Sequence, residues 1–321
     1  MTEFELIEKY FKREQPRCRF PADMGVGDDC ALMSVPPGMQ LATSCDTLVS
    51  GVHFEHGASA VDVASKAMCT NLSDLAAAGA LPAWASVALT LPRPSRSWVR
   101  QFSNRLFALA DAVQVQIIGG DTTRGPLAVT VQIFGMVEEG MSHTRGGAKV
   151  GDRIFVTGTL GGAALALRQM KRGDSPDSEC LRRLRTPIPR LGIGRAIQGL
   201  ATSCIDVSDG LNQDLTHILR RSGVGATVKL DAIPLPAASK KLGMTGLDLA
   251  LYGGDDYELC FTAPESAAAK IAEIPAIMGQ ITCIGVVEEE LGLRGASARK
   301  EIANLSNRGY QHFSSTEDVQ L

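Results

Sequence analysis

The sequence predicts two domains built from mixed helices and strands, of the α+β or α/β class. Three observations support this prediction. The chain has 321 residues, about twice the usual domain length of roughly 150 residues. Patterns typical of strands and of helices alternate along the chain. A glycine cluster (Gly140, Gly146, Gly147 and Gly151) separates two such series, so we expect domains at 1–145 and 146–321.

In the first domain the hydrophobic spacing identifies each element. Residues 60–78 place Val63, Ala67 and Leu72 at helical intervals, and Gly79 is expected to end this helix. Residues 84–91 alternate apolar and polar side chains, which is typical of a strand. The other elements expected here are helices at 3–13 and 97–112 and strands at 39–44, 115–118 and 127–137.

The second domain repeats the alternation. Residues 172–178 are polar and are expected to form a loop. The expected strands are 152–157, 203–206, 226–230, 257–262 and 281–287, and the expected helices are 161–172, 188–200, 210–221 and 264–273.

Composition excludes several classes of function. A net charge of −3 argues against a general electrostatic attraction to nucleic acid or to an anionic membrane. No apolar run reaches the roughly 18 residues that span a bilayer. The eight cysteines contain no Cys-x-x-Cys pair, which excludes zinc-ribbon and thioredoxin-type sites. We therefore expect a cytoplasmic protein that binds neither nucleic acid nor membrane.

Aspartates recur at the expected turns and strand ends. Any one of them could be an ordinary turn or helix-capping residue. Asp74 is different, because it lies within an Ala- and Leu-rich helix where Asp has a poor propensity. If these carboxylates converge, divalent cations are needed to offset their repulsion. The recurring positions are Asp28, Asp29, Asp46, Asp74, Asp121, Asp206, Asp209, Asp255 and Asp256.

The ligand types favour Mg²⁺ and phosphate. Carboxylates and hydroxyls without Cys/His sets form a hard-cation site, and Mg²⁺ usually combines one or two carboxylates with water and phosphate oxygens. Glycine pairs beside Asp121 and Asp255 allow backbone amides to approach phosphate. The sequence contains no Walker A, HRD or DFG motif, and Gly192-Ile-Gly194 is a weak dinucleotide signal. Any nucleotide site is therefore of another kind.

Taken together and in this order, the motifs resemble the thiamine-monophosphate kinase family. This family belongs to the superfamily of aminoimidazole ribonucleotide synthetase and selenophosphate synthetase. The matching segments are 25–31, 46–54, 66–79, 119–125, 206–211, 253–259 and 309–313. They extend over nearly the whole chain.

The resemblance implies an ATP-dependent phosphorylation of thiamine monophosphate to thiamine diphosphate, assisted by several Mg²⁺ ions. It also implies a homodimer in which the N-terminal domains contribute mixed sheets to a shared barrel, with a C-terminal α/β domain. The acceptor phosphate is already ionised, so we expect direct in-line transfer with no protein base or nucleophile. The alternatives are another ATP-dependent enzyme of the superfamily, similar to aminoimidazole ribonucleotide synthetase, and a non-catalytic metal- or nucleotide-binding module.

The resemblance also assigns residues to roles, with two departures from the family pattern. Cys45 stands where many relatives have Thr, and Asp255 stands where relatives usually have Glu. The implied metal ligands are Asp29, Ser44, Cys45, Asp46, Asp74, Asp121, Asp206 and Asp209; the nucleotide contacts are Gly120, Asp121, Arg145 and Ser208; and the substrate contacts are His53, Asp255 and Tyr310.

Overall fold

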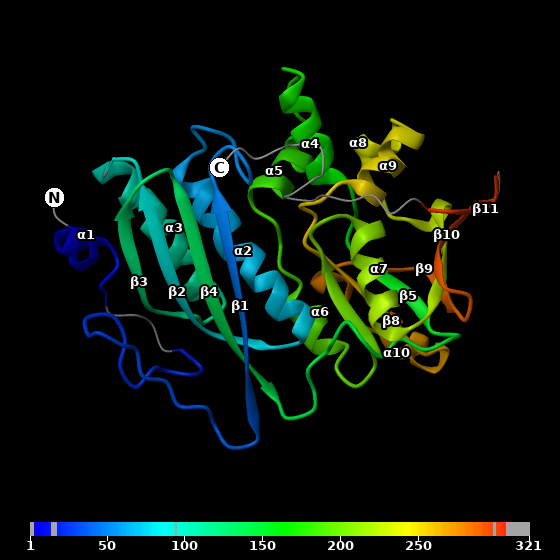
Figure 1. Cartoon of the computed structure of the whole chain (residues 1–321), viewed down its shortest axis with the longest axis horizontal. Coiled ribbons are helices and arrows are strands. Elements are labelled where there is room, and N and C mark those ends of the chain that lie inside the picture. Colours follow the sequence, from blue (N-terminus) through cyan, green and yellow to red (C-terminus); the bar gives the residue numbers. More distant parts are fainter. Residues whose placement is uncertain (1–2, 14–17, 94, 298–299, 306–321) are drawn as a thin grey trace, which may run out of the picture. The chain divides into compact units, whose positions relative to one another are not determined.

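The computed structural model describes residues 3–13, 18–93, 95–297 and 300–305. They belong to two compact units (Figure 1). The first comprises Met1–Ser142 and Arg185–Gln198, and the second comprises His143–Leu184 and Gly199–Leu321. The chain therefore passes from one unit to the other three times.

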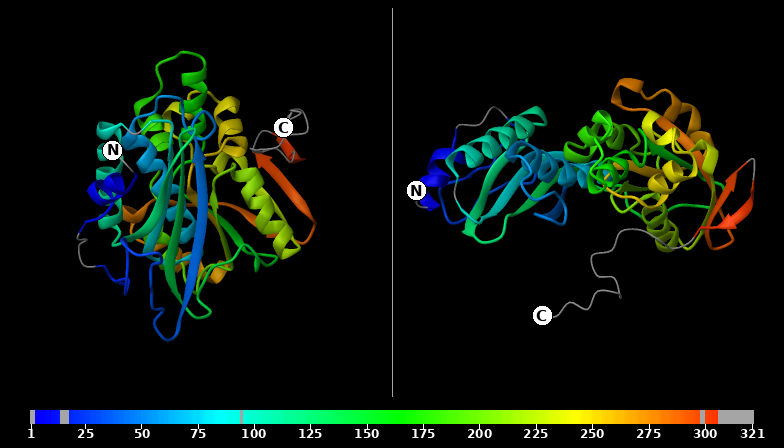
Figure 2. Two further views of the ribbon diagram at one scale, coloured as in Figure 1. Left: turned by 60° about the vertical axis from the view of Figure 1, so that its left-hand side comes forward. Right: turned by 90° about the horizontal axis from the view of Figure 1, so that it is seen from above.

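The first unit contains a mixed four-stranded sheet with the order β1-β4-β2-β3. Strand β4 (Ala128–Glu138) pairs antiparallel with both β1 (Met39–Val49) and β2 (Leu81–Leu91), and β2 pairs parallel with β3 (Gln116–Arg124). Helices α2 (Ala60–Ala78) and α3 (Arg96–Ala112) lie along one face of this sheet (Figures 1 and 2). The shorter helices of the unit are α1 (Glu3–Tyr10) and α6 (Leu191–Ala196).

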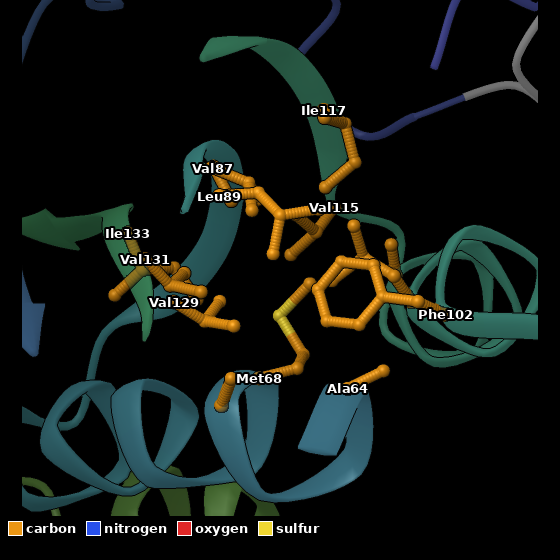
Figure 3. Close-up of a cluster of buried hydrophobic side chains, with 14 of the residues drawn as sticks. Ala64, Met68, Val87, Leu89, Phe102, Val115, Ile117, Val129, Val131 and Ile133 are labelled. Carbon is orange, nitrogen blue, oxygen red and sulfur yellow. The ribbon is translucent and has the colours of Figure 1, made fainter. Parts of the chain in front are cut away.

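The core of the first unit lies between this sheet and its two helices. Met68 of α2 and Phe102 of α3 point toward Val87, Leu89 and other branched side chains of the strands (Figure 3). All of these residues are buried. Helix α2 has the predicted bounds, and Gly79 ends it in the left-handed conformation at φ +70°. A glycine adopts that φ without a Cβ penalty.

Three strands of the first unit are longer than predicted, and one of them, β2, begins at Leu81 instead of residue 84. The turn expected at Asp46 does not form, because β1 continues to Val49 and stays in register with β4 as far as the pair Val49↔Ala128. Likewise β3 continues through Gly119-Gly120-Asp121 beside β2. Backbone pairing along a complete ladder outweighs the weak turn preference of Asp and Gly. Asp46 and Asp121 are therefore strand residues.

The second unit contains a mixed seven-stranded sheet with the order β11-β10-β7-β9-β5-β8-β6. Among the described strand pairs of this sheet, only β7–β10 is parallel. All six residues of β8 are buried, as expected for a central strand. The strands are β5 (Arg153–Thr157), β6 (Ser203–Val207), β7 (Gly225–Lys229), β8 (Glu258–Ala263), β9 (Ile281–Glu288), β10 (Gly292–Ser297) and β11 (Lys300–Asn304).

Helix α7 (Leu211–Ser222) buries Leu211, Leu215 and Ile218 in the core of this unit. The helix expected at 188–200 is reduced to the six residues of α6. The one expected at 264–273 divides into a 3₁₀ turn (Glu265–Ala267) and α10 (Ala268–Ala272). The other helices are α4 (Gly162–Lys171), α5 (Ser178–Arg185), α8 (Ala237–Lys240) and α9 (Met244–Tyr252). Within the described chain, every helix is too short or too polar to cross a membrane.

Candidate nucleotide and metal site

Strand β1 and helix α2 bring three of the predicted metal ligands together in the first unit. Ser44 and Asp46 alternate along β1 and are both partly buried. The Ser44 hydroxyl donates a hydrogen bond to Asp74 Oδ2 of α2 at 2.5 Å. The backbone amide of Asp46 donates to Asn71 Oδ1 of the same helix at 3.3 Å. Cys45 lies between them in sequence, is exposed, and takes the opposite face of the strand.

The electrostatics of this cluster favour a cation. Burial, and after it the nearby charge of Asp74, raise the pKa of Asp46 to about 6, against the lowering effect of a hydrogen bond with Thr70. Two partly buried carboxylates that repel each other are stabilised by a positive ion. The donors are all oxygens, which suits Mg²⁺. Among the described residues no three Asp, Glu, His or Cys side chains are grouped closely enough to hold a metal. A cation at this cluster would take its other ligands from water or phosphate.

The other two predicted acidic metal ligands of the first unit, Asp29 and Asp121, are both exposed. Asp29 is exposed, and its amide donates to Asp28 Oδ1 at 2.8 Å. Asp121 pairs with Ala88 across β2–β3 and is exposed. Register and alternation place it on the sheet face opposite the helices, away from Asp46. The neighbouring Gly120 has a structural reason to be glycine, because an added Cβ would lie 1.9 Å from the Val87 carbonyl oxygen.

The turn after β1 fixes the predicted substrate residue His53. The amide of Val49 donates to His53 Nδ1 at 2.9 Å, and the buried Lys66 donates to the His53 carbonyl at 2.7 Å. Arg185 binds the same turn through Glu55 at 2.6 Å. His53 is therefore held by its main chain and by one ring nitrogen.

In the second unit the segment from Asp206 to Asp209 joins β6 to α7. Asp206 is buried at the end of β6. A residue that the sequence prediction missed, Asp214, organises this segment. Its Oδ2 accepts hydrogen bonds from the amides of Ser208 and Asp209, both at 3.0 Å. Burial raises the pKa of Asp214 to about 7, against the lowering effect of the Asp209 amide bond. Its place in the first turn of α7 is the only sequence signal that could have identified it.

A second acidic loop packs on this segment. The amide of Asp255 donates to the Ser208 carbonyl at 2.8 Å, and the amide of Tyr257 donates to the Val207 carbonyl at 2.8 Å. The Tyr257 hydroxyl donates to Asp255 Oδ1 at 3.1 Å. Asp255 and Tyr257 have φ values of +68° and +50°, which cost energy for residues other than glycine. The structure therefore brings Ser208, Asp209 and Asp255 together.

The two acids after Asp255 are turned into the protein. Asp256 Oδ2 accepts from the amide of Gly161 at 2.8 Å, and burial raises its pKa to about 8. Glu258 accepts from the Thr157 hydroxyl at 2.6 Å and pairs with Arg183 at 3.4 Å. Both acids are buried, so they support the loop from inside.

Arg145 lines a cavity of about 730 Å³ in the second unit. Its positive charge acts on two residues of α7: it opposes the larger raising effect of burial on the pKa of Asp214, and it adds to the lowering effect of burial on the pKa of His217. The sequence prediction missed the other basic residues here, His217, Arg220 and Arg221. Tyr310, with the segment 309–313, lies outside the described residues.

Comparison with known proteins supplies independent information. The family model "AIR synthase related protein, N-terminal domain" matches residues 27–137, and "AIR synthase related protein, C-terminal domain" matches residues 149–296. Thiamine-monophosphate kinase of Escherichia coli (strain K12) is 43% identical over 97% of this chain and 98% of its own length.

Two solved structures are also similar. The crystal structure of thiamine-monophosphate kinase from Stenotrophomonas maltophilia K279a has a TM-score of 0.81 and 39% identity, covering 91% of this chain and 94% of that one. The structure "AaThiL complexed with AMPPCP and TMP" has a TM-score of 0.76 and 28% identity, covering 97% and 96%.

Proposed function

This chain belongs to the thiamine-monophosphate kinase family of AIR synthase related proteins, and we propose that it transfers a phosphoryl group from ATP to thiamine monophosphate. The products are ADP and thiamine diphosphate. The observation that carries this proposal is the 43% identity to a thiamine-monophosphate kinase over 97% of the chain. The complex of a 28% identical neighbour with AMPPCP and TMP supports the same pair of ligands.

The described residues suit this chemistry. Asp46 and Asp74, with Ser44, would hold Mg²⁺ in the first unit, and Asp206 and Asp209 would do so in the second. Bound Mg²⁺ supplies charge neutralisation between the two phosphate-bearing reactants. The remaining metal positions of the proposal are Asp29, Cys45 and Asp121. Cys45 directs its side chain away from Asp46, so any contact that it makes uses its backbone.

Other residues bind and orient the two substrates. Arg145 and Ser208, with Gly120 and Asp121, are assigned to the nucleotide. His53, Asp255 and Tyr310 are assigned to thiamine monophosphate. The attacking group is a phosphate oxygen that is already ionised at neutral pH, so the protein needs neither a general base nor a nucleophile. The domain roles follow: residues 1–145 carry metal, nucleotide and dimer contacts, and residues 146–321 carry further nucleotide and substrate contacts.

A homodimer is part of the proposal. One face of the four-stranded sheet carries α2 and α3, and the opposite face carries a row of threonine hydroxyls. There the hydroxyls of Thr47 and Thr130 are hydrogen-bonded at 2.8 Å, and those of Thr90 and Thr123 at 3.0 Å. Leu41 at the end of this face is 42% exposed. We propose that two copies close these faces into a barrel. Sedimentation analysis of the full chain tests this: Thr130→Arg should shift a dimer toward monomer, and a monomeric wild type would refute it.

A coupled assay tests the activity. Full-length protein with Mg²⁺ and ATP should release ADP when thiamine monophosphate is added, and thiamine diphosphate should appear in equal amount. The substrate of aminoimidazole ribonucleotide synthetase, offered in parallel, should give no turnover. Turnover of that compound alone would favour the synthetase alternative, and no turnover of either would favour a binding module. The cytoplasmic location stays a prediction.

A further inference from the structure

A basic cavity lies in the second unit between the segment 144–146 and helix α7. Its volume is about 730 Å³. The residues that line it come from these two segments only, and no carboxylate is among the described residues that do so: Thr144, Arg145, Gly146, His217, Arg220 and Arg221.

The main chain fixes the shape of this cavity. Ser222 Oγ at the end of α7 accepts hydrogen bonds from the amides of Gly147 at 3.2 Å and Ala148 at 3.1 Å. The amide of Cys204 in β6 donates to the Thr144 carbonyl at 2.9 Å. An added Cβ on Gly146 would lie 3.1 Å from Cγ of Arg221. The segment is therefore held at one end by α7 and at the other end by β6.

The cavity gathers several positively charged side chains in one place. His217 is half-buried. Its pKa is lowered first by burial and then by the positive charges of Arg145 and Arg220, against the opposing charge of Asp209. Three guanidinium groups with no carboxylate among them create a positive potential that attracts an anion. Guanidinium forks match phosphate geometry with paired hydrogen bonds.

We propose that His217, Arg220 and Arg221 complete a phosphate-binding cavity around Arg145, and that this cavity takes phosphate groups of the nucleotide. The inference rests on the proposed function, which assigns Arg145 to ATP. It adds three residues of α7 as determinants of nucleotide affinity. Asp209, a proposed metal ligand, acts electrostatically on His217 of the cavity, so a phosphate chain bound here lies within electrostatic reach of that acid.

Calorimetric titration of the full chain with AMPPCP and Mg²⁺ tests the inference without turnover. The double variant Arg220→Gln/Arg221→Gln should raise the Kd for AMPPCP at least about tenfold, whereas the Kd for thiamine monophosphate stays within about twofold. Both arginines are exposed, so the variant should fold. Arg220→Lys/Arg221→Lys keeps the charge and should recover part of the affinity.

Arg172→Gln is the matched control, because Arg172 is an exposed arginine at the end of another helix of the same unit. It should leave both affinities unchanged. Three outcomes overturn the inference: no AMPPCP binding by the wild type, an unchanged AMPPCP Kd in the double glutamine variant, or an equal loss for both ligands. If the wild type binds AMPPCP but does not phosphorylate thiamine monophosphate, the proposed function fails while the calorimetric comparison still decides the role of the cavity.

Discussion

The amide of Asp255 donates a hydrogen bond to the carbonyl oxygen of Ser208 at 2.8 Å, and this bond joins two acidic loops that are far apart in the sequence. The bond requires a very close approach of the two backbones. Gly254 makes that approach possible, because an added Cβ there would lie 2.2 Å from the Ser208 carbonyl oxygen.

We therefore expect Gly254→Ala to separate the two loops. Overpacking of this kind costs about 1–3 kcal/mol of unfolding free energy, measurable by urea denaturation. Gly119→Ala is the matched control from the other Gly-Gly-Asp motif, where an added Cβ meets nothing within 4 Å. It should change stability by less than about 0.5 kcal/mol. Equal losses in both variants would contradict this explanation.

Asp214 should tolerate an amide but not a truncation. A single oxygen, Oδ2, accepts both backbone hydrogen bonds, and the carbonyl oxygen of an asparagine can take that place. Asp214→Asn should therefore keep near-wild-type stability. Asp214→Ala leaves two backbone donors without their acceptor and should lose about 1–3 kcal/mol. Thermal and urea unfolding distinguish the two variants, and similar losses in both would show that charge matters more than the acceptor.

Asp74→Asn should abolish activity without unfolding the protein. The amide can still accept the Ser44 hydroxyl, but the negative charge is lost, and kcat/KM should fall at least about 100-fold. The charge of Asp74 is one of the causes that raise the pKa of Asp46 to about 6. The substitution should therefore also lower the pKa of Asp46, which NMR titration can follow. Asp62→Asn in the first turn of the same helix is the control and should remain active. Wild-type turnover in Asp74→Asn would exclude Asp74 from the metal site.

Stability should fall with rising pH because of Asp256. Its pKa is about 8 in the folded protein and about 4 in the unfolded chain, so the folded state keeps a proton that the unfolded state loses between these values. The contribution of protonated Asp256 to the unfolding free energy is complete below pH 4 and is lost as the pH rises to 8. The unfolding free energy falls by no more than about 1.4 kcal/mol per pH unit in this range.

Asp256→Asn removes this ionisation and retains an acceptor for the Gly161 amide. The unfolding free energy of the variant minus that of the wild type should therefore increase steadily from pH 5 to pH 8. Chemical denaturation at four pH values measures the slope. A parallel pH dependence in the two proteins would mean that another group titrates.

The sequence predicted local elements well where a single periodicity dominates. Helix α2 has its predicted bounds because its apolar spacing, the Ser59 cap and the Gly79 stop agree. The sequence could not predict that β1 continues through Asp46, because the length of β1 depends on its pairing with β4, which is remote in sequence. Helix α9, β10 and β11 were missed because the pattern there is weak.

The candidate site was predictable as a set of residues but not as an arrangement. Motif spacing identified Ser44, Asp46 and Asp74, and the structure brings them together. Spacing could not indicate that Asp121 faces away from Asp46, since that depends on strand register. Asp214 and His217 were missed because a helical acid or imidazole has many ordinary roles, and only the folded surroundings distinguish this one.

Helix α6 belongs to the first unit although it follows three elements of the second. Its Gly194 packs so closely on α2 that an added Cβ would lie 2.0 Å from the Ala76 carbonyl oxygen. A fragment that ends at residue 145 would therefore lack α6, and the surface of α2 that α6 covers would be exposed to solvent. Autonomous folding of the amino-terminal half requires residues 185–198 to be supplied as well, by a redesigned connection or as a separate peptide.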